Sequence, residues 1–521
     1  MPKIANPILR GFNPDPSIVR VNDDYYIATS TFEWFPGVQI HHSRDLVHWR
    51  LITHPLTRVS QLDMLGVPDS GGIWAPCLTH SDGLFYLVYT NVLSYGEPYV
   101  GHNYVVTAPD IMGPWSEPIY LNSSGFDPSM FHDDDGRKWV VNRFCSKGGG
   151  ILLQEYSPEQ RALIGTPEHI FNETPLGMTE APHIYKHNGY YYLMVAEGGT
   201  EYNHAVTVAR STAINGPYEV DPQNPMLTSA HAPDIELQKA GHASIAQAQN
   251  GDWYMVHLCG RPRGEERRCL LGRETAIQKV EWSSDNWLRL VHGGSQPIAE
   301  LDAPDLPEHS FAPEPERDDF NSQTLSVHLN SLRVPVDDSW LSLTERPGWL
   351  RLRGRVSLQS YQNQSLIARR LQAFSCEAET CMEFEPDNDQ QAAGLICLYN
   401  TRLYHYLYVS RNRDGQKLLS ISSCNAGSFN APLQKDVIID GWERVYLKAC
   451  VNYPRLVFQY SQDGESWQAI GSELDATILT DEYALLSGYG WFTGAFFGLC
   501  AQDLSGKNKH ADFDYFIYRE G

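Results

Sequence analysis

Five residues suited to acid–base chemistry or to sugar contact recur at one spacing in the first half of the chain. Asp15, Trp74, Asp127, Glu180 and His242 each lie nine positions before a glycine or aspartate that marks a turn. These marker residues are Asp24, Gly83, Gly136, Gly189 and Gly251. Carboxyl and imidazole groups are the side chains that proteins most often use to move protons. A position that varies among such residues, in an otherwise constant repeat, predicts a ring of active-site residues.

The repeat around each of these residues has the pattern of a β-hairpin. A short apolar run follows the chemical residue, then a Gly/Asp turn, then an aromatic run, as in HNGYYYLMVA at 187–196. Five hairpins at similar intervals between residues 15 and 254 predict one unit repeated around an axis, a five-bladed β-propeller. Because the first strand of each blade lines the central channel, the five residues are expected to meet in one pocket.

The length and the second half of the chain predict a second domain. The chain has 521 residues, more than one ordinary domain, and residues 301–320 are rich in proline and charge. Short alternating segments such as HYLYVSRN and RVYLKACV follow, which are typical of a β-sandwich. We therefore expect an all-β protein with a propeller at 1–305, a linker at 306–320 and a β-sandwich at 321–521.

The net charge and the cysteine content limit which partners and which cellular compartment are expected for the protein. The formal net charge is −23, which argues against nucleic-acid partners. No apolar run has the length needed to cross a bilayer, and the first 15 residues lack the apolar core of a signal peptide, so no membrane partner is expected. The ten cysteines are scattered and lack a Cys-x-x-Cys pair, which favours reduced structural thiols. A cytoplasmic location is the expectation.

Several motifs together resemble a known family. They are Asn13-Pro-Asp-Pro-Ser17, Ser30-Thr-Phe-Glu-Trp-Phe-Pro-Gly37, Ile73-Trp-Ala-Pro76, Phe126-Asp-Pro-Ser129, Thr179-Glu-Ala-Pro-His183 and Leu271-Gly-Arg-Glu-Thr-Ala276. In this order they resemble glycoside hydrolase family 43, in particular its two-domain β-xylosidase branch. Gly490-Trp-Phe-Thr-Gly-Ala-Phe496 resembles the C-terminal sandwich of that branch, so the resemblance spans nearly the whole chain.

The resemblance implies a role for each of three carboxyl groups. Asp15 matches the general base that activates water, Glu180 the general acid, and Asp127 the carboxylate that orients the acid and tunes its pKa. Hydrolysis of a glycoside with inversion needs one protonated and one ionised carboxyl group on opposite faces of the sugar. A third carboxylate beside Glu180 is expected to raise the pKa of the acid by repulsion between like charges.

Further residues are expected around the substrate. Trp74 occupies a ring position, and Phe32 and Trp34 lie just past the first hairpin, where flat apolar faces suit a pyranose ring. The resemblance implies that Arg273 is an active-site arginine that binds the substrate, and its guanidinium fork suits sugar hydroxyls or a carboxylate. It also implies that Phe492, on a loop of the sandwich, closes one side of the pocket.

The resemblance places His242 at the channel floor beneath the carboxylates. A calcium ion lies near this position in some members of the family. No cofactor is expected to be required, with a Ca²⁺ ion near His242 as the alternative.

The expected function is that of an exo-acting, inverting β-D-xylosidase that releases xylose from the non-reducing ends of short xylo-oligosaccharides. Two alternatives stay open at this point. The first is an α-L-arabinofuranosidase or an enzyme with both activities, and the second is a sugar-binding propeller without catalysis. A homo-oligomer, either a dimer or a tetramer, is expected.

Overall fold

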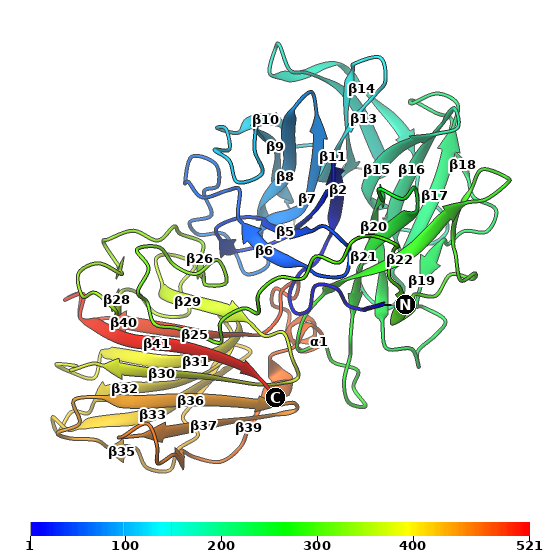
Figure 1. The fold of residues 1–521 in the computed structure, drawn as a ribbon. Coiled ribbons are helices and arrows are strands. Elements are labelled where there is room, and N and C mark those ends of the chain that lie inside the picture. The colour runs from blue at the N-terminus through cyan, green and yellow to red at the C-terminus, as the bar shows by residue number, and fades with distance from the viewer. Residues whose placement is uncertain (1, 97, 147) are drawn as a thin grey trace.

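The computed structural model describes residues 2–96, 98–146 and 148–521 and has two parts that pack side by side. The first, blue to green in Figure 1, is a five-bladed β-propeller, and the second, yellow to red, is a β-sandwich. The predicted all-β fold is therefore confirmed. Within the described residues, no helix has the length and apolar character needed to cross a membrane.

Each propeller blade is an antiparallel sheet whose strands follow one another along the chain. Blade 1 contains β2 (Ser17–Val21), β3 (Asp24–Thr29), β5 (Gln39–Ser43) and β6 (Arg50–Thr53), and blade 2 contains β7 (Gly72–Ser81), β8 (Leu84–Ser94), β9 (Val100–Ala108) and β10 (Ile119–Asn122). Blade 3 contains β11 (Gly125–His132), β12 (Lys138–Phe144), β13 (Ile151–Ser157) and β14 (Ala162–Phe171). Blade 4 contains β15 (Glu180–His187), β16 (Tyr190–Glu197), β17 (Ala205–Ser211), β18 (Glu219–Val220) and β19 (Leu227–Thr228), and blade 5 contains β20 (Gln238–Gln247), β21 (Trp253–Gly260), β22 (Glu274–Trp282) and β23 (Leu288–Leu290).

The innermost strands close the propeller into a ring. β2, β7, β11, β15 and β20 contact one another in this order, and β20 returns to β2. Apolar side chains between neighbouring blades form the core, as where Ile40 of blade 1 and Leu87 of blade 2 share one buried cluster. Outside the blades, β1 (Lys3–Ala5) pairs with β24 (Glu300–Asp302), which ties the two ends of this domain together.

The sandwich consists of two antiparallel sheets with a shared apolar core. One sheet contains β27 (Leu341–Ser342), β28 (Leu350–Arg353), β41 (His510–Glu520), β30 (Ser375–Glu383), β36 (Val445–Asn452), β37 (Arg455–Ser461) and β38 (Gln468–Ala469), with β25 (Arg317–Asp318) and β39 (Leu474–Asp475) at its sides. The other contains β34 (Ser428–Asn430), β33 (Lys417–Asn425), β32 (Leu403–Arg411), β31 (Gln391–Asn400), β40 (Phe496–Asp503), β29 (Ser365–Arg370), β26 (Asn330–Leu332) and β4 (Trp34–Phe35), with β35 (Val437–Ile438) beside β33. The 3₁₀-helix η1 (Ala476–Ile478) and the helix α1 (Asp481–Leu486) precede β40.

Two short strands cross the predicted domain boundaries, which stay predictions. β25 lies inside the segment expected to be a linker, and it pairs with β41 of the sandwich. β4 comes from the propeller half of the chain, and it pairs with β26 at the edge of a sandwich sheet. The two domains are thus joined by main-chain hydrogen bonds as well as by side chains.

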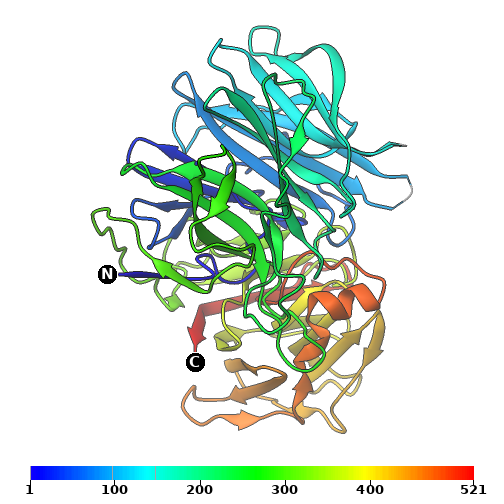
Figure 2. The ribbon, with the colours of Figure 1, turned by 90° about the vertical axis from the view of Figure 1, so that its right-hand side faces the viewer.

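A buried lysine fastens helix α1 to the propeller, and Figure 2 shows this helix against the propeller loops. Nζ of Lys239 lies 2.7 Å from Oε1 of Glu482 in α1 and 3.3 Å from Oε2 of Glu201 in the propeller. The same Glu482 accepts a 2.7 Å hydrogen bond from the main-chain N–H of Cys269. This ion-pair network fixes the position of the segment that leads from α1 to Phe492.

Candidate active site

A pocket of ≈ 470 Å³ is lined by residues from all five blades and from the sandwich. The five residues of the predicted ring all line it. They are Asp15, Trp74, Asp127, Glu180 and His242. Phe32, Arg273 and Phe492, also expected at the site, line the same pocket. Segments more than 400 residues apart in the sequence therefore meet here.

The ring residues occupy two adjacent structural positions rather than one. The inner strands share a residue with left-handed backbone at Asp15 (φ 57°), Ala75 (27°), Asp127 (52°), Ala181 (51°) and His242 (46°). Trp74 and Glu180 precede this residue by one position. The spacing of nine residues did not reveal this difference, because the hairpin turns that hold the marker glycines differ in length. In blade 1 the marker residue Asp24 is not in the turn but begins a strand. The strand register shifts beside these positions in β7, β11, β15 and β20, and such bulges turn side chains towards the channel mouth.

Asp15 is held by three neighbours. The hydroxyl of Ser30 donates a 2.6 Å hydrogen bond to its Oδ2, and Nη1 of Arg273 donates a 3.2 Å bond to its Oδ1. Nδ1 of His242 lies 3.5 Å from the same Oδ1. These contacts fix the orientation of a buried carboxyl group, which is a requirement for a general base.

Asp127 and Glu180 are coupled through the strand that carries the glutamate. Oδ2 of Asp127 accepts a 3.1 Å hydrogen bond from the main-chain N–H of Ala181, the residue after Glu180. Burial raises the pKa of Glu180 to about 7; the charge of Arg143 opposes this shift, and the charge of Asp15 adds to it. Burial, followed by the charges of Glu180 and Asp15, holds the pKa of Asp127 well above its usual range. Asp127 and Glu180 together therefore retain at least part of a proton near neutral pH.

Burial is the first cause of the raised pKa of Glu180, and the charge of Asp15 adds to it. Repulsion between Asp127 and Glu180 acts on both carboxyl groups, and it adds to the effect of burial on the pKa of Asp127. The role of Asp127 in tuning the pKa of the acid stays a prediction.

Two contacts, absent from the sequence-based expectations, hold the start of β15. Nη1 of Arg143 donates a hydrogen bond to the main-chain oxygen of Thr179, directly before Glu180. The hydroxyl of Thr179 donates a 2.6 Å bond to Oε1 of the buried Glu197. Arg143 also lies over the ring of Phe126, 5.5 Å from its centroid. A guanidinium thus lies between the strands that carry the two coupled acids.

Arg273 connects the carboxylates to the sandwich. Besides Asp15, it donates hydrogen bonds of 3.0 Å to the hydroxyl of Thr200 and 3.1 Å to the main-chain oxygen of Phe492. Its guanidinium lies 5.3 Å from the ring centroid of Phe32 and 5.2 Å from that of Phe492. This side chain therefore depends on both domains for its position.

His242 lies at the pocket beside Asp15 and Arg273, and burial is the main cause that lowers its pKa. A neutral imidazole is therefore expected here. Calcium takes six to eight oxygen ligands. No group of three or more His, Cys, Asp and Glu side chains suited to a metal occurs among the described residues. The surroundings of His242 offer one carboxylate and one guanidinium, so they do not fit a calcium ion well.

Aromatic rings form one wall of the pocket. Phe32 and Phe492 stack with their centroids 5.6 Å apart at an interplanar angle of 25°. Trp74 meets Phe492 edge-on at 5.3 Å, and Trp491 lies 4.2 Å from Phe492. Such a wall suits the C–H faces of a sugar ring.

The predicted position of Trp34 at the pocket mouth is corrected. The side chain is 1% exposed and stacks on Phe496 of the sandwich, with the ring centroids 4.0 Å apart. It lies in β4, and the pairing of β4 with β26 places the side chain in the interface between the domains. Trp34 is therefore a core residue and is not one of those that line the pocket in the described part of the chain.

Other lining residues had no distinguishing pattern in the sequence. They are Tyr95, Tyr99, Phe126, Met178, Gly198, Gly199, Thr200, Glu201 and Trp491. Most of these residues lie on loops or at strand ends. There the sequence repeat does not fix their positions relative to the five ring residues. Phe126 and Trp491 are the exceptions, since they directly precede Asp127 and Phe492 and lie in motifs on which the resemblance rests.

The geometry supports acid–base chemistry on a neutral, ring-shaped substrate. Glu180 has a pKa near neutrality and can donate a proton, while Asp15 is oriented by donors as an acceptor. The aromatic wall and the hydrogen-bonding groups together are typical of carbohydrate pockets.

Comparisons with known proteins agree with this description. Residues 4–288 match the family described as glycosyl hydrolases family 43. Residues 317–519 match the domain described as the beta xylosidase C-terminal concanavalin A-like domain.

Full-length relatives have the same two-domain extent. A beta-xylosidase of Bacillus subtilis (strain 168) is 50% identical over 99% of this chain and 100% of its own length. A xylosidase/arabinosidase 43B of Humicola insolens is 49% identical over 100% of this chain and 98% of its own. The crystal structure of a xylan beta-1,4-xylosidase from Bacillus halodurans C-125 is 55% identical, with a TM-score of 0.97 over 99% of this chain and 100% of that one. This chain therefore belongs to glycosyl hydrolases family 43.

Proposed function

We propose that this protein is an exo-acting, inverting β-D-xylosidase that releases xylose from the non-reducing ends of short xylo-oligosaccharides. The observation that carries the proposal is the meeting of Asp15, Asp127 and Glu180 in a pocket whose wall the sandwich completes through Phe492. The names of the Bacillus relatives support xylose as the sugar that is released.

The proposed chemistry divides the work among the three carboxyl groups. Glu180 donates its proton to the leaving oxygen, which its raised pKa permits near neutral pH. Asp15 takes a proton from water on the opposite face of the sugar. Asp127 holds the strand of the acid through the N–H of Ala181. No covalent bond between sugar and protein forms in this mechanism.

The exo preference follows from the wall formed by Phe492 and Trp491. Both residues come from the sandwich and cover one side of a pocket that the propeller alone would leave open. A pocket closed in this way accepts the end of a chain and excludes its middle.

An α-L-arabinofuranosidase, alone or together with xylosidase activity, is the second candidate. The name of the Humicola relative, at 49% identity, favours it. A non-catalytic sugar-binding propeller is the third candidate, but binding alone gives no reason for three carboxyl groups in one pocket.

Two assays separate these candidates. Hydrolysis of nitrophenyl β-D-xyloside beside nitrophenyl α-L-arabinofuranoside gives the sugar preference, and no hydrolysis of either would leave only the binding role. Proton NMR early in turnover gives the stereochemistry. α-Xylose as the first product from a β-xyloside supports inversion, whereas β-xylose first would make Asp15 a nucleophile.

Three further properties are part of the proposal. The ten cysteines are free, which supports a cytoplasmic location because reducing compartments keep thiols unpaired. The exposed apolar side chains of Leu486 and Phe429 on the sandwich support a homo-oligomer, a dimer or a tetramer, which light scattering would test. The enzyme is proposed to need no metal, and activity after treatment with a chelator would test this.

A further inference from the structure

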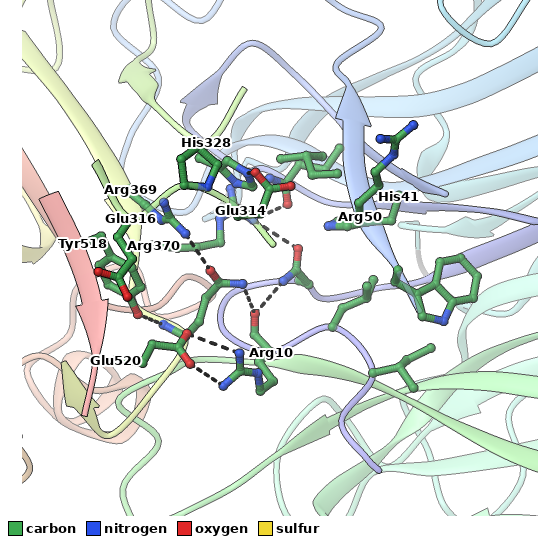
Figure 3. Close-up of a pocket in the computed structure, with 18 residues that line it drawn as sticks. Arg10, His41, Arg50, Glu314, Glu316, His328, Arg369, Arg370, Tyr518 and Glu520 are labelled. Carbon is green, nitrogen blue, oxygen red and sulfur yellow. Dashed lines mark hydrogen bonds and ion pairs between the residues drawn. The ribbon is translucent and has the colours of Figure 1, made fainter. Parts of the chain in front are cut away.

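A second cavity, of ≈ 450 Å³, lies between the propeller and the sandwich. Figure 3 shows Arg369 and Arg370 entering it from the sandwich side, and His41 and Arg50 from the propeller side. It shares none of its lining residues with the active-site pocket. Its chemistry is therefore separate from that of the carboxylate trio.

Two neighbouring guanidinium groups of β29 dominate this cavity. Arg370 is 5% exposed and donates to neutral acceptors, the main-chain oxygen of Phe12 and the side-chain oxygens of Asn13, Gln39 and Asn330. Arg369 has one hydrogen-bond acceptor, Oε1 of Gln372 at 3.5 Å. Among the described residues, neither arginine has a carboxylate oxygen within 4.0 Å of its nitrogens, unlike most buried cations.

The carboxylates of the cavity already have cationic partners. The pairs are Glu314 with His328 at 3.2 Å, Glu520 with Arg10 at 2.7 Å, and Glu316 with Arg519 at 3.0 Å. Arg369 and Arg370 thus have no carboxylate of their own, although the charges of Glu314 and Glu520 act on Arg369 from a distance.

Buried nitrogen atoms without hydrogen-bond partners lie around the same space. Nε of Arg369 and Nδ1 of His41, a side chain that is 6% exposed, lack a hydrogen-bond partner within the described chain. Burial lowers the pKa of Arg369 and, together with the charge of Arg369, lowers that of Arg370 to about 9. The site therefore bears the energetic cost of two neighbouring positive charges and of buried polar atoms without partners.

We propose that this cavity binds a small oxyanion with two or more negative charges, of the phosphate or polycarboxylate class. Guanidinium forks bind such groups through paired N–H···O bonds, and both Arg369 and Arg370 line the cavity in which the anion would lie. Because the walls of the cavity come from both domains, a bound anion would strengthen the docking of the propeller against the sandwich. Arg370 also binds Phe12 and Asn13, which lie just before Asp15 in the sequence. An anion bound at Arg370 would therefore stabilise the segment that carries Asp15.

Thermal unfolding and calorimetric titration of the full chain in Tris-chloride buffer test this site. Inorganic phosphate and citrate are the probes, with sodium chloride at equal ionic strength as the reference. We expect a saturable rise of Tm with one or both probes that chloride does not reproduce. A rise with phosphate alone or with citrate alone identifies the class of anion.

Variants at Arg369 separate binding from a merely structural role. Arg369→Gln should weaken binding about tenfold or more, because it removes the fork and its charge. Without anion its Tm should stay close to that of the parent, since the lost contact with the Tyr518 ring opposes the gain from removing a partly buried charge. Arg369→Lys keeps the charge and should retain weaker binding. Arg413→Gln, at a guanidinium on the far, exposed surface, is the matched control and should bind as the parent does.

Three results would overturn the proposal. The first is a Tm rise that chloride matches, and the second is an equal rise in the parent and in Arg369→Gln. The third is a marked fall in the Tm of Arg369→Gln without anion, since that would assign Arg369 a structural role in the empty cavity. Binding is measured without substrate, so none of these results depends on the glycosidase activity.

Discussion

The guanidinium of Arg273 in the propeller donates a 3.1 Å hydrogen bond to the main-chain oxygen of Phe492 in the sandwich. The same guanidinium reaches Asp15, so the proposed base and the second domain share one side chain. Catalysis and domain docking are therefore expected to fail together.

The aromatic wall gives the first prediction. Phe492→Ala should lower kcat/KM on xylobiose about tenfold or more, because it removes a ring from the substrate wall, while Tm stays near that of the parent. Leu504→Ala is the control, since Leu504 lies in the same domain, is 54% exposed and is far from any role assigned above. Equal kinetics for the two variants would remove Phe492 from the substrate site.

Separation of the domains gives the second prediction. A fragment of residues 1–315 should lack xylosidase activity, although it keeps Asp15, Asp127 and Glu180. It loses the partner of β4, the 2.6 Å ion pair between the buried Asp69 and Arg333, and the acceptor of Arg273. Activity of the purified fragment on nitrophenyl xyloside checks this. A soluble fragment with full activity would show that the sandwich is dispensable.

The role of Glu180 as acid gives the third prediction. Glu180→Ala should lose about a hundredfold to ten-thousandfold in rate on xylosides with poor leaving groups, and much less on those with good ones. Asp15→Ala should be nearly inactive across the whole series, because water activation is needed for every substrate. Glu168→Ala, at an exposed glutamate, is the control. A uniform loss for Glu180→Ala would refute its role as acid.

The pKa of Glu180 gives the fourth prediction. Since burial raises this pKa to about 7, kcat/KM should fall as the pH rises through about 7 and the acid loses its proton. The charge of Arg143 opposes the shift, so Arg143→Met should move this fall to higher pH. Arg413→Met should leave the profile unchanged. A profile of Arg143→Met that coincides with the parent, or moves to lower pH, would contradict the assignment.

A second buried glutamate gives a prediction on stability. Burial raises the pKa of Glu33 to about 8, the charge of Asp69 adds to the shift, and the charge of Arg333 opposes it. A raised pKa means that stability is full below the unfolded value near 4.5 and is lost as the pH rises towards 8. Glu33→Gln removes this loss, so its Tm advantage over the parent should grow from pH 5 to pH 8.

Calorimetry at the two pH values measures this difference, with Glu168→Gln as an exposed control. In the Glu33→Gln variant, the amide oxygen of the new side chain would still accept the hydrogen bond that the N–H of Ser70 donates to Glu33. The same Tm difference at both pH values would contradict the prediction.

The sequence predicted the parts of the site that repeat. The hairpin spacing predicted that Asp15, Asp127 and Glu180 meet in one channel, because each blade repeats a similar strand length before its turn. The same spacing treated two adjacent structural positions as one, since the distance to a turn residue does not reveal how many residues the turn contains. Trp34 was misplaced because an aromatic residue beside a channel has the same pattern as one in an interface, and its partner Phe496 lies far along the chain.

The pairing of β4 with β26 has a consequence for synthesis of the protein on the ribosome. Trp34 and Phe35 emerge roughly 300 residues before the strand that pairs with them, so nascent blade 1 carries an unpaired edge and an uncovered indole until the sandwich has been translated. The loop that carries Trp34 therefore gains its strand partner once Leu332 has been made, and its stacking partner only with Phe496. Aggregation during expression should then originate from this edge, and co-expression of residues 316–521 should suppress it for the 1–315 fragment.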